Sequence, residues 1–383
     1  MSSNEVSFQK NIYTYADLST FGGQYSFVYA INNTGQMAGS DTKNEPGDES
    51  VFAPATYAAI WDNSYHVSKT TLLSGQDSNA YGINNLSTVV GSSSEDINGH
   101  TQTVATAWQN GETRYLPSLS NGQYKSIARA INDHGVIVGE SFTNSASNES
   151  RATLWDDTGV IDLGTLGGKY SEAFAINNTG TVAGWASTGK PDDFMHPVIW
   201  KEGKIINLSP THLGMAASIN DYGIAAGFIV DEQQSSRATV WINQKEIILT
   251  SNAGTYSYTN AINNKNQIVG SELTKDGQQH ALLWNGPDSA PVNLDQFLDQ
   301  SQIDDGWQLS GASGINDKGW IIGTASNAKT HEVHAFVLTS DGITGLTGAA
   351  PPETAQVAAT VAVTTVASPL THEATADIWS GMV

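Results

Sequence analysis

Two sets of side chains in this sequence could carry chemistry, and the first set is aromatic. Five short loops, most of them rich in glycine, each place one aromatic residue just before an apolar segment. These residues are Tyr25, Tyr124, Tyr170, Tyr256 and Trp307. Exposed aromatic rings stack on sugar rings, and a polar tip orients the ligand. Tyrosine at a loop-to-strand boundary also packs between structural units, so the set predicts a carbohydrate-binding surface with a structural alternative.

The second set lies four residues before a repeated tryptophan, or before the leucine that replaces it in the last copy. Its members are Tyr57, Val104, Arg151, His196, Arg237, His280 and His334. Alternation along a strand sends this position to the same side as the tryptophan. The cationic members could bind an acidic sugar or another anion, and a histidine beside arginine and tyrosine could act as the base of a polysaccharide lyase. The alternative is the polar end of a packed strand, stacked on neighbouring aromatic residues.

Other chemical signatures are weak. Acidic loops near Glu95, Asp192 and Asp304 could hold calcium, but they lack EF-hand spacing. The sequence has no nucleophile elbow, phosphate-binding loop or dinucleotide fingerprint in a suitable strand–helix context. A pair of glycosidase carboxylates cannot be chosen from the sequence, because their separation in space decides that chemistry. We assign no catalytic residue and no metal ligand, and we expect no cofactor, with calcium as the alternative.

A phrase that recurs seven times must position these side chains. It begins with Ile-Asn, continues with Asn or Asp, and has Gly, Ser or Asn two residues later. Its isoleucines, 43 to 53 residues apart, are Ile31, Ile83, Ile131, Ile176, Ile219, Ile262 and Ile315. Asn-Thr-Gly between two apolar segments predicts a three-residue hairpin loop closed by a left-handed residue. Ser87 is the copy that should be strained there, and the first Asn should bond its own turn.

Each repeat offers four strands joined by loops too short for a helical crossover, so their pairing should be antiparallel. Four such strands in 40 to 50 residues are typical of a propeller blade. We predict an all-β, seven-bladed propeller over residues 1–349 and an Ala/Thr/Val/Pro-rich tail over 350–383. A strand near Leu18 or one at 343–346 could close the ring. A two-sheet sandwich and an open solenoid are the alternatives.

Composition limits the partners. The net charge of −21 repels phosphate backbones and anionic lipid, so we expect no nucleic-acid partner. The chain has no cysteine, which excludes disulfides and thiolate chemistry. It shows no Sec-type signal peptide and no apolar stretch of about 20 residues that would span a bilayer. We expect a monomer without membrane insertion.

Residues 10–347 resemble the HAF-type extracellular repeat family. The resemblance rests on Asp-Leu-Gly-Thr-Leu-Gly-Gly at 162–168, Ala-Ile-Asn-Asn-Thr-Gly at 175–180 and the literal His-Ala-Phe at 334–336. It implies a bacterial, exported, β-rich protein, and it implies no catalytic mechanism. Without a Sec-type signal, we expect an extracellular or cell-surface protein that leaves the cell by another route, with a cytoplasmic location as the alternative.

The sequence favours a secreted or surface-associated binding protein that recognises a carbohydrate or protein ligand through one propeller face. Propeller loops vary freely on a rigid scaffold, and function is placed there. The first alternative is a polysaccharide lyase or glycosidase acting in the central funnel. The second is a protein-interaction scaffold. Positions at which the seven copies differ are the candidates for function.

Overall fold

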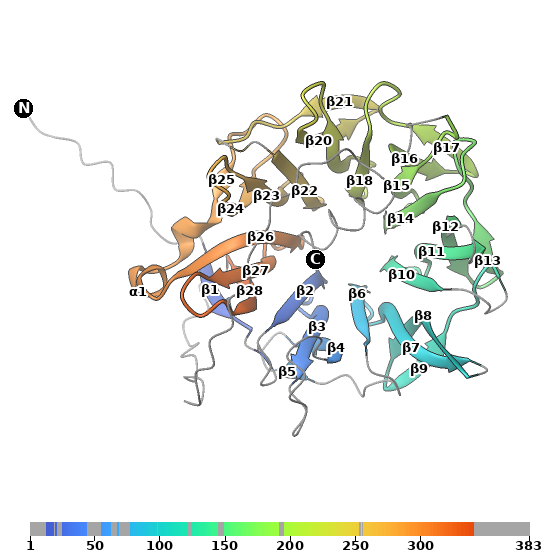
Figure 1. Ribbon diagram of the computed structural model, residues 1–383, viewed down its shortest axis with the longest axis horizontal. Helices are drawn as coiled ribbons and strands as arrows, with labels where there is room; N and C mark the ends of the chain where they lie inside the picture. Colours follow the sequence, from blue (N-terminus) through green and yellow to red (C-terminus); the bar gives the residue numbers. More distant parts are fainter. Residues whose placement is uncertain are drawn as a thin grey trace, which may run out of the picture. The chain divides into compact units, whose positions relative to one another are not determined.

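Each repeat folds into one four-stranded antiparallel sheet, and seven such sheets surround a common axis as the blades of a propeller (Figure 1). The computed structural model describes residues 13–18, 20, 25–43, 55–62, 67–68, 77–97, 99–120, 125–144, 149–190, 195–252, 254 and 256–340. The chain divides into two units, Met1–Gly342 and Ile343–Val383, and the propeller lies in the first. The predicted fold class is confirmed.

In every blade the strands follow the chain order outward from the axis, apart from the outermost strand of the last blade. The innermost strands are β2 (Ser26–Ile31), β6 (Asn79–Ile83), β10 (Ser126–Ile131), β14 (Ser171–Ile176), β18 (Gly214–Ile219), β22 (Tyr256–Ile262) and β26 (Trp307–Ile315). The second strands are β3 (Met37–Lys43), β7 (Val89–Ile97), β11 (Ile137–Asn144), β15 (Val182–Ala186), β19 (Ala225–Val230), β23 (Ile268–Leu273) and β27 (Ile321–Asn327).

The third strands carry the repeated tryptophan or its replacement: β4 (Ala55–Trp61), β8 (His100–Gln109), β12 (Glu149–Asp156), β16 (His196–Lys201), β20 (Ser236–Ile242), β24 (Gln279–Trp284) and β28 (Val333–Thr339). The outermost strands are β5 (Val67–Ser68), β9 (Glu112–Tyr115), β13 (Gly159–Asp162), β17 (Lys204–Asn207), β21 (Lys245–Ile248), β25 (Val292–Asn293) and β1 (Thr14–Asp17). Two short helices, η1 (Leu294–Phe297) and α1 (Gln300–Asp304), precede β26. Among the described residues, no helix is long and apolar enough to cross a bilayer.

The N-terminal strand closes the ring. β1 pairs antiparallel with β28, from Thr14 opposite Thr339 to Asp17 opposite Phe336, so the last blade is built from both ends of the propeller sequence. The other predicted closing strand, at 343–346, lies outside the described residues, as does the tail at 350–383.

The apolar core is divided among the seams between blades. At one seam, Val138 and Ala152 of the third blade pack with Ala173, Val182 and Trp200 of the fourth. Several of the indoles also donate hydrogen bonds to the segment that precedes their blade, as Trp155 does to the Pro117 carbonyl and Trp284 to the Thr250 carbonyl. The repeated tryptophan therefore joins neighbouring blades.

The glycine in each second strand lies against its own inner strand. A Cβ on Gly139 would stand 2.0 Å from the carbonyl oxygen of Ile127, and a Cβ on Gly227 would stand 1.9 Å from that of Met215. The inner strands carry a β-bulge beside this contact, and a bulge locally disrupts the ladder and bends the strand. The glycine therefore permits a close backbone approach of the neighbouring strand in the same blade.

Candidate functional site

The first asparagine of the repeated phrase closes a ring of hydrogen bonds around the axis. Each Nδ2 donates to the backbone carbonyl of the equivalent asparagine in the next blade at 2.9–3.2 Å, and Asn316 donates back to Asn32. Each Oδ1 accepts the backbone N–H groups two and four residues later, as Asn132 does from His134 and Val136. The predicted bond within the turn is confirmed, and the bond between blades is an additional role.

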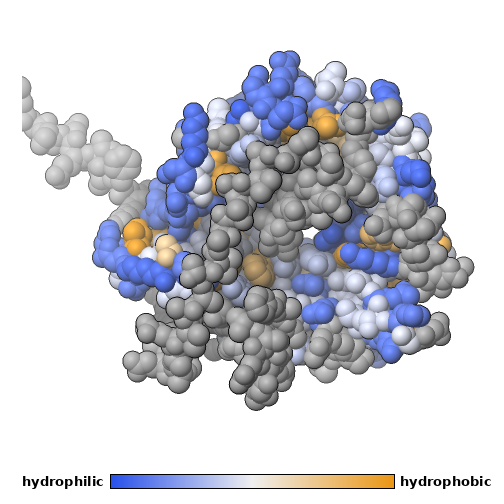
Figure 2. Space-filling model, in the orientation of Figure 1, coloured by the Kyte–Doolittle hydropathy of each residue, from blue (hydrophilic) through white to orange (hydrophobic). Residues whose placement is uncertain are grey.

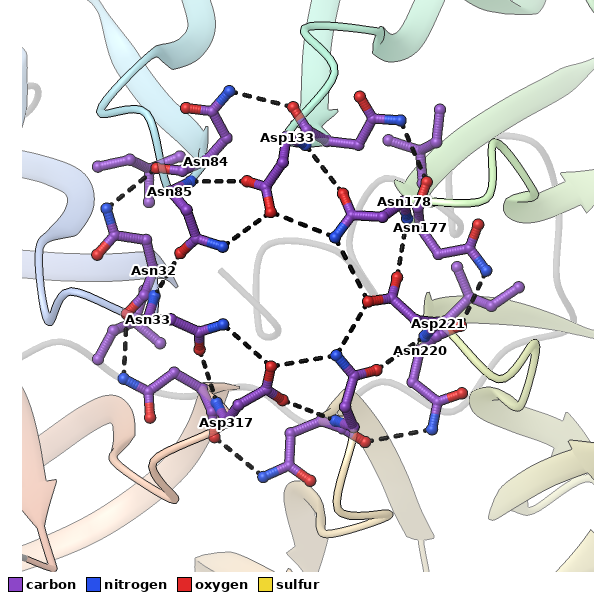
Figure 3. Close-up of a pocket in the computed structure, with 18 of the residues that line it drawn as sticks. Asn32, Asn33, Asn84, Asn85, Asp133, Asn177, Asn178, Asn220, Asp221 and Asp317 are labelled. Carbon is purple, nitrogen blue, oxygen red and sulfur yellow. Dashed lines mark hydrogen bonds between the residues drawn. The ribbon is translucent and has the colours of Figure 1, made fainter.

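The residue after this asparagine, which is Asn or Asp, forms another closed ring. Its backbone N–H donates to the side-chain Oδ1 of the equivalent residue in the next blade at 2.8–3.0 Å. Around the axis the residues are Asn33, Asn85, Asp133, Asn178, Asp221, Asn264 and Asp317. The Oδ2 of each aspartate accepts from the amides on both sides, at 2.8–3.4 Å (Figure 3). Amides thus separate the three carboxylates.

These rings and the seven isoleucines line an axial cavity of about 180 Å³. The carboxylates of Asp133, Asp221 and Asp317 point into it (Figure 3). Among the residues that the structure describes, no group of three or more His, Asp or Glu side chains is arranged to hold a metal ion. The cavity is polar, and its lining groups are already engaged with one another.

The tips of the seven turns surround this cavity, and we call this side of the propeller the turn face. The residue at the tip of each turn lies two positions after the first asparagine. It is exposed in every copy and differs between most of them: Thr34, Leu86, His134, Thr179, Tyr222, Lys265 and Lys318. Tyr222 is 74% exposed and Leu86 is 63% exposed. The left-handed residue behind each tip is as predicted, with φ of 62° at Ser87 and 80° at Gly135. The seven tips therefore present five types of side chain from equivalent turns.

The predicted aromatic set lies at the other end of the innermost strands, on what we call the opposite face. Tyr25, Tyr170, Tyr256 and Trp307 are each half-buried, and Tyr25 is bridged to Val333 of the neighbouring blade. Tyr124 lies outside the described residues. These side chains stand in different blades, in the position expected for packing between units.

The predicted cationic set lies on the same opposite face, at the start of the third strands, and its members have local partners. Four members have partners within 15 positions in the sequence. His196 Nδ1 lies 3.1 Å from the Ser209 carbonyl, and His280 Nδ1 lies 2.9 Å from Asp295. Arg237 Nε lies 2.6 Å from Asp231, and Arg151 Nε lies 3.9 Å from Asp162. His196 is only 4% exposed. The set is thus distributed over five blades.

His334 contacts a member of the aromatic set. Its ring centroid lies 4.7 Å from that of Trp307, and its Nδ1 lies 2.8 Å from Asp17 Oδ2 on the closing strand β1. Burial alone would lower the pKa of His334, but the hydrogen bond and charge of Asp17, with Glu332 and Asp41, raise it overall. This contact joins the two ends of the propeller sequence.

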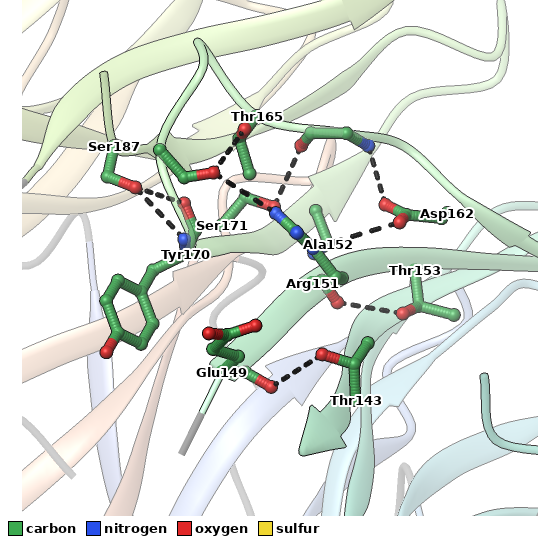
Figure 4. Close-up of polar contacts among 12 residues, drawn as sticks. Thr143, Glu149, Arg151, Ala152, Thr153, Asp162, Thr165, Tyr170, Ser171 and Ser187 are labelled. Carbon is green, nitrogen blue, oxygen red and sulfur yellow. Dashed lines mark hydrogen bonds and ion pairs between the residues drawn. The ribbon is translucent and has the colours of Figure 1, made fainter. Parts of the chain in front are cut away.

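Arg151 and Tyr170 lie together at the seam between the third and fourth blades (Figure 4). Arg151 Nη1 donates to the Gly168 carbonyl at 3.4 Å, and Lys169 pairs with Glu149 at 2.8 Å. The hydroxyl of Ser171 accepts from the Ala152 N–H at 2.9 Å. Arg151 and the Lys169–Glu149 pair therefore lie at one seam of the opposite face, and the Tyr170 ring points away from Arg151 (Figure 4).

Sequence reasoning did not find the bulged residues of the innermost strands, several of which contact one another between neighbouring blades; we call the region where they lie the lumen. Each innermost strand has a β-bulge two positions before its repeated isoleucine. The bulged residues are Tyr29, Tyr81, Arg129, Phe174, Ala217, Asn260 and Ser313. This position differs in most copies between nearly constant neighbours, and that contrast is the signal that could have found it.

Arg129 bridges two blades in the lumen. Its guanidinium lies 2.8 Å from Glu172 of the fourth blade and 3.7 Å from Glu140 of its own blade, and it stacks on the Tyr81 ring at 4.9 Å. Glu140 and Glu172 are 6% and 7% exposed. We call Arg129, Glu140 and Glu172 the lumen cluster.

Comparison with known proteins supports the fold. A family model described as a protein of unknown function, DUF3466, matches residues 24–159. No curated protein matches the chain. The propeller domain of the Trilobed protease from Pyrococcus furiosus, which has an open velcro topology, is 11% identical with a TM-score of 0.51, over 72% of this chain and 85% of that one.

Two further solved structures are similar. YCF48 bound to D1 peptide is 12% identical with a TM-score of 0.52, over 88% of this chain and 98% of that one. The acylaminoacyl peptidase of Pyrococcus horikoshii is 10% identical with a TM-score of 0.51, and the match covers 84% of this chain and 52% of the peptidase. At these identities the likeness shows the propeller fold alone.

Figure 2 shows one side of the molecule coloured by hydropathy, and there the hydrophobic residues are scattered among hydrophilic ones. The large hydrophobic side chains that are exposed among the described residues are Leu86, Tyr115, Ile161, Tyr222, Ile248 and Ile303. Two of these six belong to the tips of the turn face.

Proposed function

We propose that this protein is a binding protein that recognises a protein ligand through its turn face. The observation that carries the proposal is the combination of seven exposed tip residues, of five different types, with backbones held by two closed rings of hydrogen bonds. A propeller fold is consistent with a binding or interaction scaffold. Because the tips are already ordered, a ligand does not bear the cost of ordering loops.

The tips offer the side chains that protein interfaces use. Tyr222 presents a large amphipathic side chain, and Leu86 presents an apolar side chain on another blade. Aromatic side chains carry much of the energy of protein interfaces. Lys265 and Lys318 lie on adjacent blades of a strongly acidic chain, so they would fix the orientation of an acidic segment. YCF48, a similar propeller, has been solved with a peptide, which supports a peptide or protein ligand here.

A display selection tests this proposal. We expect peptides selected from a random library against the purified protein to lose at least about tenfold in affinity on Tyr222→Ala, because a buried aromatic anchor contributes about 1.4 kcal/mol or more. The matched control is Tyr170→Ala on the opposite face, which should leave affinity unchanged. Selected peptides that respond only to Tyr170→Ala would contradict the proposal.

A carbohydrate ligand on the opposite face is the second candidate, favoured by Tyr170 next to the Lys169–Glu149 pair and at the same seam as Arg151 (Figure 4). A glycan array separates the two candidates. Signals that are lost when Tyr124, Tyr170 and Tyr256 are all changed to Ala, and retained in Tyr222→Ala, would support carbohydrate binding. Incubation with anionic polysaccharides, followed in the ultraviolet for unsaturated products, tests the lyase alternative on the same samples.

We also propose an extracellular or cell-surface location, supported by the resemblance to HAF-type repeats. Fractionation of cells that produce the full chain tests it. Recovery in the medium or on the cell surface is expected, and recovery only with cytoplasmic markers would contradict it.

A further inference from the structure

The lumen cluster holds one more carboxylate than cation. The Nη2 atom of Arg129 lies 2.8 Å from a Glu172 oxygen and 3.7 Å from a Glu140 oxygen, and Nε lies 3.0 Å from the same Glu172 oxygen. Both carboxylates are buried. One guanidinium therefore faces two carboxylates where water is scarce, and an unpaired buried charge is costly.

No second cation balances the cluster among its described neighbours. Glu172 on β14 faces Arg129 from β10 and Glu140 from β11, and β15 contributes the uncharged Trp185. Tyr81 from β6 faces Arg129, as does the Phe174 ring at 5.9 Å. The charge that can change most readily in this group is therefore that of the carboxylate pair.

We propose that the lumen cluster is a proton-dependent lock: the Glu140–Glu172 pair binds one proton between two blades and so tightens the seam that Arg129 bridges. With the proton bound, one carboxylate pairs with Arg129 and the other is neutral. Without it, two like charges meet across the seam between the third and fourth blades. The proton changes the contact between the two blades because Arg129 on β10 and Glu140 on β11 belong to one blade and Glu172 on β14 belongs to the next.

Burial and the charge of Glu140 raise the pKa of Glu172 to about 7, although Arg129 and Trp185 act in the opposite direction. The folded state thus holds a proton that the unfolded chain releases near the ordinary carboxyl pKa. The group contributes stability fully below that ordinary value, and the contribution is lost as the pH rises to about 7. The lock is therefore engaged in mildly acidic solution.

Two measurements on the full chain test the lock. Infrared difference spectra between pH 5.5 and pH 8 report the carbonyl stretch of a protonated carboxyl, and urea denaturation at the same two pH values reports stability. We expect the wild type to show the protonated-carboxyl band and to unfold about tenfold more readily at pH 8 than at pH 5.5, relative to Glu172→Gln, because the linked proton is then lost.

The variants decide the outcome. Glu172→Gln and Glu140→Gln should each abolish the band and the relative pH effect, since one carboxylate then pairs with Arg129. Glu272→Gln, a control at another buried glutamate on β23, should retain both. A band that persists in either lumen variant, or a wild type whose stability changes with pH no more than that of Glu172→Gln, would overturn the proposal.

Discussion

At the scale of single residues, one asparagine in each repeat has two structural roles. Its Oδ1 accepts two N–H groups of its own turn, and its Nδ2 donates to a carbonyl in the next blade. Only an amide side chain provides an acceptor and a donor at this length. Aspartate would retain the turn but would place a carboxylate oxygen against a carbonyl. This is why the first residue is always Asn, whereas the second position accepts Asn or Asp.

We therefore expect Asn132→Asp to destabilise the fold at least as much as Asn132→Ala. Either change leaves the buried carbonyl of Asn177 without its donor, at a cost of about 2–4 kcal/mol in the free energy of unfolding. His134→Ala, on the exposed tip of the same turn, should change that free energy by less than about 0.5 kcal/mol. Urea denaturation of the three variants measures this, and an aspartate variant as stable as the wild type would contradict the role of Nδ2.

His334 gives a second prediction at this scale. Its pKa is raised by Asp17, so the contact contributes stability below the ordinary histidine pKa and loses it as the pH rises through the raised value. Asp17→Asn should remove about 0.5–1 kcal/mol at pH 5.5 and much less at pH 9. Melting of both proteins across this range measures the difference, and an equal loss at both pH values would mean that the pair does not act through charge.

At the scale of the element, the second strand of each blade has a glycine at a position where a Cβ atom would collide with the neighbouring strand. The carbonyl of Ile127 points at Gly139 beside the bulge of β10. Gly139 has no left-handed backbone, so its glycine is explained by the close approach of the neighbouring strand and not by its own backbone angles.

Gly139→Ala should accordingly cost more than about 3 kcal/mol in the free energy of unfolding, because backbone must move to admit the methyl group. Gly111→Ala is the matched control. Gly111 has φ of 80°, but a Cβ there would meet nothing within 4 Å, so its cost should be about 1 kcal/mol. Equal costs in chemical denaturation would show that backbone angle, not crowding, explains the strand glycine.

The strands, turns and blade number could be predicted because the sequence repeats them seven times. What the sequence did not reveal is contact between equivalent positions of neighbouring repeats. Arg129 lies at the bulge of β10 and pairs with Glu172 of the next blade, and the local sequence around either residue does not predict this contact. The sequence did single out the cationic set, but it did not reveal that a member such as Arg237 already pairs with Asp231, only a few positions away.

At the scale of the whole molecule, the rings at the turn face make closure cooperative. Each hydrogen bond in them needs the next blade, so the last bond, from Asn316 to Asn32, forms only when the first and last blades meet. With seven positions, amide and carboxylate cannot alternate perfectly, and Asn33 and Asn85 are the one amide pair that stands side by side. Every aspartate still lies between two amides, which keeps the three charges apart.

The strand that holds this ring shut is β1, and its removal is the decisive test of closure. Leu18, 1% exposed, packs at the seam between the last and first blades, and its carbonyl accepts the Trp61 indole N–H at 3.2 Å. Deleting residues 1–18 should therefore expose an unpaired edge of β28 and lower the melting temperature by more than about 10 °C, since several kcal/mol of burial and pairing are lost. Leu18→Ala should give a smaller loss of about 2–4 kcal/mol, and deletion of residues 350–383 is the control truncation at the other terminus, expected to leave melting unchanged. A protein lacking residues 1–18 that melts like the wild type would mean that the seven blades stay closed through their turn-face rings alone.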